Sequence, residues 1–220
     1  MMQGEPQRDP IREAIVLVLA VVLLTVVHFH GFTGGLDPGG TLAAWFAFNI
    51  VLLLGVPVLV IRVVFREPLA DWGLGLGRPR VWGADLARLA VVVLPAAFLI
   101  ARLPAIRATY PVYRAVLGEP WLWIPSTLGW GAYCFAWEFF FRGFLLFGLG
   151  RRLGPLAVFV QMVPFVMAHY PKSEAETLLA IPAGLVLGVL AWRGESLLGA
   201  WILHWFAATA VNVFAAIGAR

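Results

Sequence analysis

The sequence predicts an all-α fold, a polytopic bundle of about seven to eight transmembrane helices. Of the 220 residues, 61% are hydrophobic and 13% are charged, and the mean hydropathy is +0.88. Soluble domains carry roughly twice that share of charged residues. Apolar stretches also alternate along the whole chain with short polar or Gly/Pro-rich breaks. We therefore expect residues 1–220 to form one integral domain in the cell membrane, crossing it several times.

Seven apolar stretches are long enough to be considered as spans. The first, 14–29, also has the length of a signal-peptide core, but acidic residues at Glu5, Asp9 and Glu13 occupy a flank that would otherwise be basic. It is expected to be a retained helix. The other stretches are 41–65, 86–103, 121–148, 154–169, 178–192 and 196–217.

The breaks between these stretches predict how the spans are connected. Residues 66–85 form the longest polar loop, in which Trp72 is expected to dock at the membrane interface. Arg151 and Arg152 mark a turn between the fourth and fifth stretches, which are expected to form a helical hairpin.

Charge also predicts orientation and excludes some partners. Arg residues are concentrated in the second, fourth and sixth loops, which places these loops and the N-terminus in the cytoplasm, although the third loop also contains three Arg residues. The net charge of +4 is scattered over short loops, so no nucleic-acid partner is expected. The single cysteine, Cys134, has no partner for an internal disulfide.

Four ionisable side chains interrupt the apolar stretches. Glu138 and Arg142 lie within WEFFFRGFLLF, His169 ends VPFVMAH, and His204 lies within LLGAWILHWFAATA. An ionisable group in hydrocarbon costs several kcal/mol unless it is paired or wetted, and such residues usually mark a functional site. At 1.5 Å per residue, Glu138, His169 and His204 lie roughly 16 to 25 Å from the cytoplasmic ends of their helices. Three helices are therefore expected to bring a carboxylate and two imidazoles into one layer.

Each of these residues also has a purely structural interpretation. Glu138 and Arg142 are four residues apart, so they share a helix face and can form a structural ion pair. His169 can be an interfacial residue at a helix end, and His204 can make a hydrogen bond between helices. Their shared depth favours a common site.

The three segments that contain Glu138 and Arg142, His169, and His204 together resemble the CAAX protease and bacteriocin-processing family of intramembrane endopeptidases, also called CPBP or Abi. The family signature is Glu-Glu-x-x-x-Arg, then Phe-x-x-x-His, then His-x-x-x-Asn or Asp on successive core helices. Here it is matched by WEFFFRG at 137–143, by the segment from Phe165 to His169, and by His204. The resemblance covers a core of about 121–217. It implies cleavage of a membrane-anchored or lipidated protein or peptide by an activated water, without a cofactor.

This chain departs from the signature at two positions. Trp137 replaces the first glutamate, which in the family activates water together with the histidine of the second block. Ala208 replaces the Asn that holds the oxyanion together with the last histidine, and Asn212 can supply that amide only if its helix is bent or broken. Since adjacent helix positions differ by roughly 100°, Glu138 does not point where the missing carboxylate would point. The Trp-Glu form of the first block is similar to the myxosortase branch, which implies the processing of C-terminally anchored surface proteins.

The resemblance implies a glutamic-type mechanism for this chain. Glu138, held by Arg142, acts with His169 to deprotonate water, and His204 donates to the oxyanion. A zinc site formed by Glu138, His169 and His204 ranks lower, because a metal-ligating glutamate does not need Arg142 beside it.

Two non-protease functions are rivals. A catalytically degenerate member of the family would act as a membrane peptide-binding, immunity or scaffold protein, and Trp137 and Ala208 favour it. A small transporter with a Glu/His proton relay fits the buried ionisable residues, but the chain has no recognisable inverted repeat.

Overall fold

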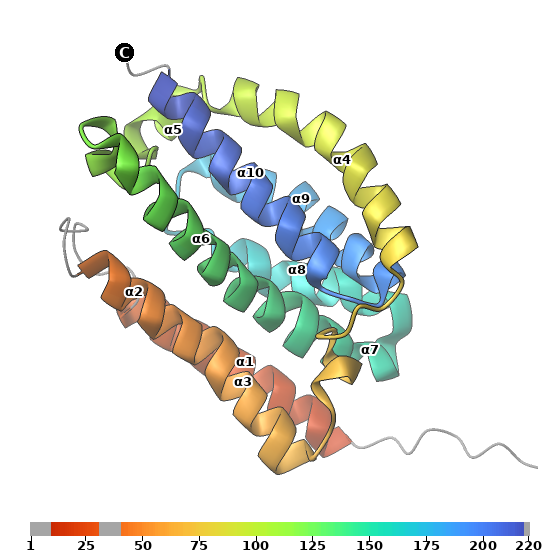
Figure 1. Ribbon diagram of the computed structural model, residues 1–220. Helices are drawn as coiled ribbons and strands as arrows, with labels where there is room; N and C mark the ends of the chain where they lie inside the picture. Colours follow the sequence, from red (N-terminus) through yellow and green to blue (C-terminus); the bar gives the residue numbers. More distant parts are fainter. Residues whose placement is uncertain (1–9, 31–40, 218–220) are drawn as a thin grey trace, which may run out of the picture.

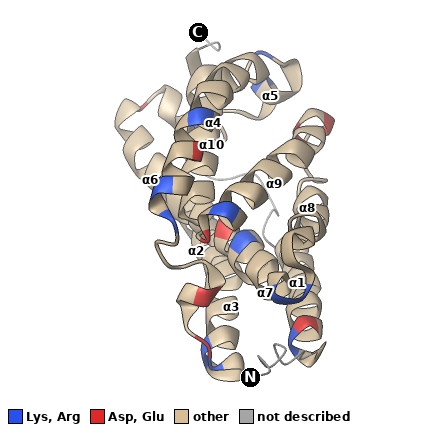
Figure 2. Ribbon diagram, turned by 90° about the vertical axis from the view of Figure 1, so that its right-hand side faces the viewer, with Lys and Arg blue, Asp and Glu red and all other residues tan. Residues whose placement is uncertain are grey.

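The computed structural model describes residues 10–30 and 41–217, and in these residues the chain forms helices, turns and loops without a strand. Six helical segments within them are apolar and long enough to cross a membrane. Figure 2 shows long stretches of ribbon without Lys, Arg, Asp or Glu. The all-α fold is confirmed, and the chain is a multi-pass membrane protein.

Seven spans were expected, and six segments are found in the same order, because the expected spans 121–148 and 154–169 fall within one segment, Pro120–Met167. The second segment is one continuous helix. A π-helical turn, Val51–Gly55, joins α2 to α3, and a second one, Val60–Phe65, follows α3. The principal helices are α1 (Pro10–His30), α2 (Thr41–Ile50), α3 (Val56–Leu59), α4 (Pro79–Ile100), α5 (Pro104–Thr109), α6 (Trp123–Glu138), α7 (Gly148–Leu153), α8 (Ala157–Met167), α9 (Glu174–Gly194) and α10 (Leu198–Ile217).

The expected hairpin is present, and its two arms differ in length. From α6 the chain continues through a π-helical stretch, Phe139–Phe147, into α7, and it turns at Gly154, whose φ is 56°. A glycine suits this left-handed position because it has no Cβ. The returning arm, α8, has 11 residues and is only about 16 Å long. Since the hydrocarbon core is about 30 Å thick, α8 does not cross it alone.

Helix α6 occupies the centre of the bundle. Figure 1 shows α1, α2 and α3 on one side of α6, with α10 and α4 on the other, and α2 and α10 both pack against α6. Helices α8 and α9 pack against each other and against the π-helical stretch, and α9 also contacts α4 and α10. The order of contacts from α2 through α6 and α10 to α4 places the polar residues of α6 and α10 inside the protein.

Trp72 is fully buried, so the expectation that it lies at the membrane interface is wrong. Its ring stacks between Phe65 and Phe144, with centroids 5.6 Å from each, and its Nε1 donates a hydrogen bond to Glu67. The tryptophan therefore anchors the loop after α3 to the π-helical stretch. Burial became possible because Glu67 satisfies the indole N–H.

A second contact of this loop depends on Gly77, which has a φ of 53°. A Cβ at this position would lie 2.2 Å from the carbonyl oxygen of Gly194, at the end of α9. The next residue, Arg78, donates its backbone N–H to the same oxygen. Close backbone approach is therefore required where the loop meets α9.

We expect Gly77→Ala to lower the free energy of unfolding by about 1 kcal/mol or more, because both the positive φ and the clash penalise a side chain. The matched control is Gly83→Ala in α4, where an added Cβ meets nothing within 4 Å. That change should be neutral or stabilising, since alanine favours a helix over glycine. Thermal unfolding in detergent measures both, and equal effects would contradict the packing described for Gly77.

Candidate functional site

Glu138 and Arg142 form a buried ion pair at the junction of α6 and the π-helical stretch. Both side chains are 0% exposed, and Arg142 Nη1 donates to Glu138 Oε1 at 3.0 Å. The guanidinium also lies 4.2 Å from the centroid of the Phe165 ring and donates to the carbonyl of Gly184 at 3.4 Å. The four-residue spacing therefore produces the predicted pair, which offsets the cost of burying each charge.

The same carboxylate oxygen reaches a second helix. His204 of α10 places Nδ1 at 2.6 Å from Glu138 Oε1. A carboxylate accepts, so the imidazole donates from Nδ1 and its other nitrogen, Nε2, carries the lone pair. The second oxygen, Glu138 Oε2, is buried without a hydrogen-bond partner. Glu138 thus fixes the tautomer and the orientation of the His204 ring.

His169 lies in the turn after α8, and its ring contacts other residues than the Glu138 carboxylate that His204 contacts. Its Nδ1 lies 2.7 Å from the carbonyl oxygen of Phe165, which only accepts, so Nδ1 carries the proton. The ring packs edge-to-face against Trp137, with centroids 5.8 Å apart. Burial lowers the pKa of His169 to about 3, so the ring is neutral at physiological pH. His169 therefore presents a second lone pair, on Nε2.

The two histidines line one cavity of about 440 Å³, together with Trp137 and Cys134. The cavity lies between α4, α6, α9 and α10. Glu138 does not line it and sits behind His204, so the three residues of the predicted layer have unequal access to a ligand. The cause is helix rotation: Trp137 faces the cavity, and the next residue of α6 points elsewhere.

Asn212 also lines the cavity, but its amide is engaged away from His204. Its Oδ1 accepts from the backbone N–H of Val112 at 3.0 Å, and its Nδ2 donates to the carbonyl of Ala208 at 2.9 Å. Helix α10 is continuous through this region. Eight residues of helix separate Asn212 from His204, about 12 Å along the axis. The structure therefore does not bring Asn212 to the Glu138–His204 pair.

Within residues 10–30 and 41–217, no three His, Cys, Asp or Glu side chains come together as ligands for a metal ion. The Nδ1 of His204 is already hydrogen-bonded to the Glu138 carboxylate, which would have to bind the zinc ion in such a site. This arrangement does not fit the zinc site of Glu138, His169 and His204 considered from the sequence.

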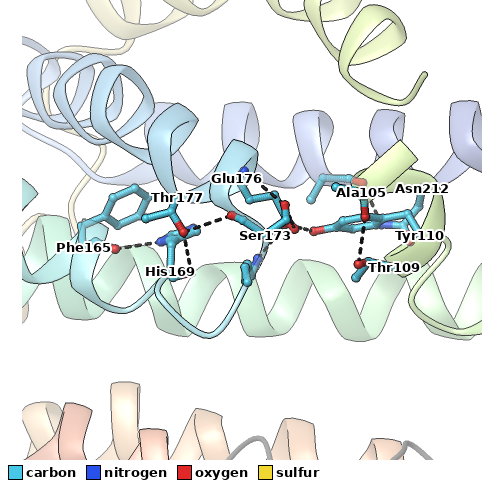
Figure 3. A network of polar contacts seen from close by, with 11 residues as sticks. Ala105, Thr109, Tyr110, Phe165, His169, Ser173, Glu176, Thr177 and Asn212 are labelled. Carbon is cyan, nitrogen blue, oxygen red and sulfur yellow. Dashed lines mark hydrogen bonds and ion pairs between the residues drawn. The ribbon is translucent and has the colours of Figure 1, made fainter. Parts of the chain in front are cut away.

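Sequence reasoning missed a polar cluster that lines the cavity close to His169, whose backbone carbonyl accepts a hydrogen bond from the backbone N–H of Lys172. It consists of Tyr110, Lys172 and Glu176. Figure 3 shows Tyr110 and Glu176 with their neighbours. The Tyr110 hydroxyl donates to Glu176 at 2.7 Å, and Lys172 Nζ lies 3.5 Å from the same carboxylate. Burial raises the pKa of Tyr110, which keeps the phenol protonated as a donor. The available signal was the run of polar residues that follows His169.

We expect Arg142→Leu to destabilise the fold by about 3 to 5 kcal/mol, because it leaves the Glu138 carboxylate buried without its cation. The control is Arg78→Leu, which removes a loop guanidinium that pairs with Glu195 and is 59% exposed. Surface pairs of this kind contribute at most about 1 kcal/mol. Thermal unfolding in detergent compares the two variants, and equal, mild losses would argue against a buried pair that matters for folding.

Comparison with known proteins bears on the region that contains these residues. A family model described as type II CAAX prenyl endopeptidase Rce1-like matches residues 119–210. No curated protein and no solved structure matches the chain. The match confirms the resemblance seen in the sequence, and residues 119–210, which carry Glu138, Arg142, His169 and His204, are similar to the Rce1-like CAAX endopeptidases.

Proposed function

We propose that the protein is an intramembrane endopeptidase in which Glu138 acts through His204. Residues 119–210 are similar to a family of intramembrane endopeptidases. The observation that carries the proposal is the 2.6 Å contact between Glu138 Oε1 and His204 Nδ1, in a ring that lines the cavity. A buried carboxylate that orients an imidazole is the arrangement by which hydrolases prepare a histidine as general base.

The proposed roles of these residues differ from those implied by the resemblance, and the geometry of the pair supports the difference. Glu138 is fully buried, so it is poorly placed to meet a water molecule, whereas His204 is 22% exposed. His204 Nε2 would take a proton from water, and Glu138 would stabilise the resulting imidazolium. Arg142 would stabilise the carboxylate in turn. The glutamate remains essential, but as the partner of the base.

His169 lines the same cavity as His204 and can assist the same reaction. Its neutral ring offers a lone pair on Nε2, which can accept a hydrogen bond from the attacking water. The water oxygen then adds to the peptide carbonyl, the proton moves to His204, and His204 returns it to the departing amine as the C–N bond breaks. No covalent intermediate with the enzyme is formed.

The cavity favours a substrate that arrives from the membrane. Its wall includes Val92 of α4 together with Leu179 and Val186 of α9, which are 67%, 37% and 37% exposed on helices expected to face lipid. An apolar entrance suits a membrane-anchored or lipidated segment. The Trp137-Glu138 sequence supports the further proposal that the protein belongs to a myxosortase-like branch and acts on C-terminally anchored proteins.

One observation favours a second candidate function. Trp137 occupies the cavity wall beside His169, where the resemblance implies a water-activating carboxylate, and Ala208 lines the same cavity. A site built in this way can hold a membrane peptide without cleaving it. The alternative is therefore a catalytically degenerate family member that serves as a peptide-binding, immunity or scaffold protein.

We expect Glu138→Gln to lower the rate of cleavage of an anchored reporter peptide in liposomes by roughly 10²- to 10⁴-fold, because an amide neither fixes the His204 tautomer nor stabilises the imidazolium. The matched control is Glu195→Gln, which alters a loop carboxylate that is 54% exposed and pairs with Arg78, and it should leave the rate unchanged.

Trp137→Glu separates the two candidate functions in the same assay. An enzyme of the proposed kind is active as wild type and loses activity in Glu138→Gln. An inactive wild type that gains activity in Trp137→Glu would instead identify a degenerate protease and would overturn the proposed function.

A further inference from the structure

The site cavity has one chemically distinct end. Most of its wall is apolar, as in the stretch formed by α4 and α9. At one end, however, the wall contains Tyr110, Lys172, Glu176 and Asn212. Polar groups in the wall of an intramembrane cavity usually mark a path for water or for a charged ligand.

The segment 101–119, which connects α4 to the start of α6, covers this polar end. It contains the six-residue helix α5, and its Ile106 and Tyr110 form part of the cavity wall. Figure 1 shows α5 at the end of the bundle where α10 also ends. A helix this short has little stability of its own, so the position of the segment depends on its contacts with the bundle.

One such contact joins the segment to α9. The Tyr110 hydroxyl donates to Glu176 Oε1 at 2.7 Å, as Figure 3 shows. Glu176 is itself held in place, because it also accepts a hydrogen bond from the hydroxyl of Ser173 at 3.1 Å and pairs with Lys172. The acceptor of the bond is therefore fixed to the first turn of α9.

A second contact joins the segment to α10. The backbone N–H of Val112 donates to Asn212 Oδ1 at 3.0 Å. Asn212 is oriented by its own bond to the Ala208 carbonyl, one turn earlier in α10. Apart from these bonds, the buried side chains Ile106 and Val116 provide an apolar contact. The segment is thus attached to the bundle by the hydrogen bonds of Tyr110 and Val112 and by apolar packing that includes Tyr113. Local opening of the segment would break both of these bonds.

We propose that residues 101–119 form a gate over the polar end of the cavity, and that Tyr110 and Asn212 are positioning residues that hold it closed. The role of the gate rests on the proposed function: hydrolysis consumes water and turns a peptide bond into a carboxylate and an amine. These charged products do not leave easily past the apolar stretch of α4 and α9. The polar end gives water a way in and the released peptide a way out.

The gate can be tested without a substrate, by hydrogen–deuterium exchange of the full-length protein in lipid nanodiscs. Each hydrogen bond contributes about 1 kcal/mol net, so Tyr110→Phe and Asn212→Leu should each speed exchange of residues 103–118 by roughly fivefold. Together they should speed it by roughly 25-fold, because both bonds close the same gate. The matched control is Thr109→Val, since the Thr109 hydroxyl bonds to Ala105 inside the segment and does not bridge to the bundle.

The pattern of exchange distinguishes a gate from a general role in folding. We expect residues 139–147 and 180–192 to keep wild-type exchange, and the thermal unfolding temperature to change little. Wild-type exchange of 103–118 in both variants, an equal rise in Thr109→Val, or a rise across the whole protein would each overturn the proposal. Failure of the wild type to cleave any anchored peptide would count against the proposed function alone, because the exchange result does not depend on cleavage.

Discussion

The burial of one carboxylate, Glu138, shapes the centre of this protein. A carboxylate that is 0% exposed within a membrane bundle is stable only if other groups compensate its charge. Arg142 and His204 do so through a single oxygen, at 3.0 and 2.6 Å. These contacts join α6, the π-helical stretch and α10, and Arg142 extends the network to α9 through the Gly184 carbonyl. The elements that carry the site are therefore held together by the interaction that prepares its chemistry.

The cavity in front of this pair gives each histidine a separate role. His204 is tied to a charge, whereas His169 is tied to a backbone carbonyl and is neutral. The apolar wall between α4 and α9 suits a membrane-anchored chain, and the polar end beneath residues 101–119 suits water and charged products. An intramembrane hydrolase needs both kinds of access, because its substrate comes from lipid and its second reactant comes from water.

Much of the architecture could be predicted from apolar length alone. The order of the long helices and the hairpin turn near Arg151 follow from the rise of a helix and the thickness of a bilayer, although α8 is too short to be the separate span expected for residues 154–169. The depth of Glu138, His169 and His204 in the bilayer, counted along their helices, also predicted that the three lie in one layer. The depth of a residue gives its position along the helix axis but not the direction in which its side chain points. The sequence therefore did not reveal that Glu138 bonds to His204 while Trp137 faces the cavity. The π-helical stretch that follows Glu138 has no signature in the sequence.

Other features depend on contacts between distant segments. Asn212 lies in α10 where a catalytic amide was considered, but Val112, 100 residues earlier, occupies its oxygen. Trp72 is buried because Phe65, Phe144 and Glu67 complete a pocket for it. The central claim, that Glu138 acts through His204, is tested most directly by a double-mutant cycle in kcat/KM with Glu138→Gln and His204→Ala. We expect the double variant to be about as impaired as His204→Ala alone, because the two residues act as a unit. Losses that multiply would show independent roles and would contradict the claim.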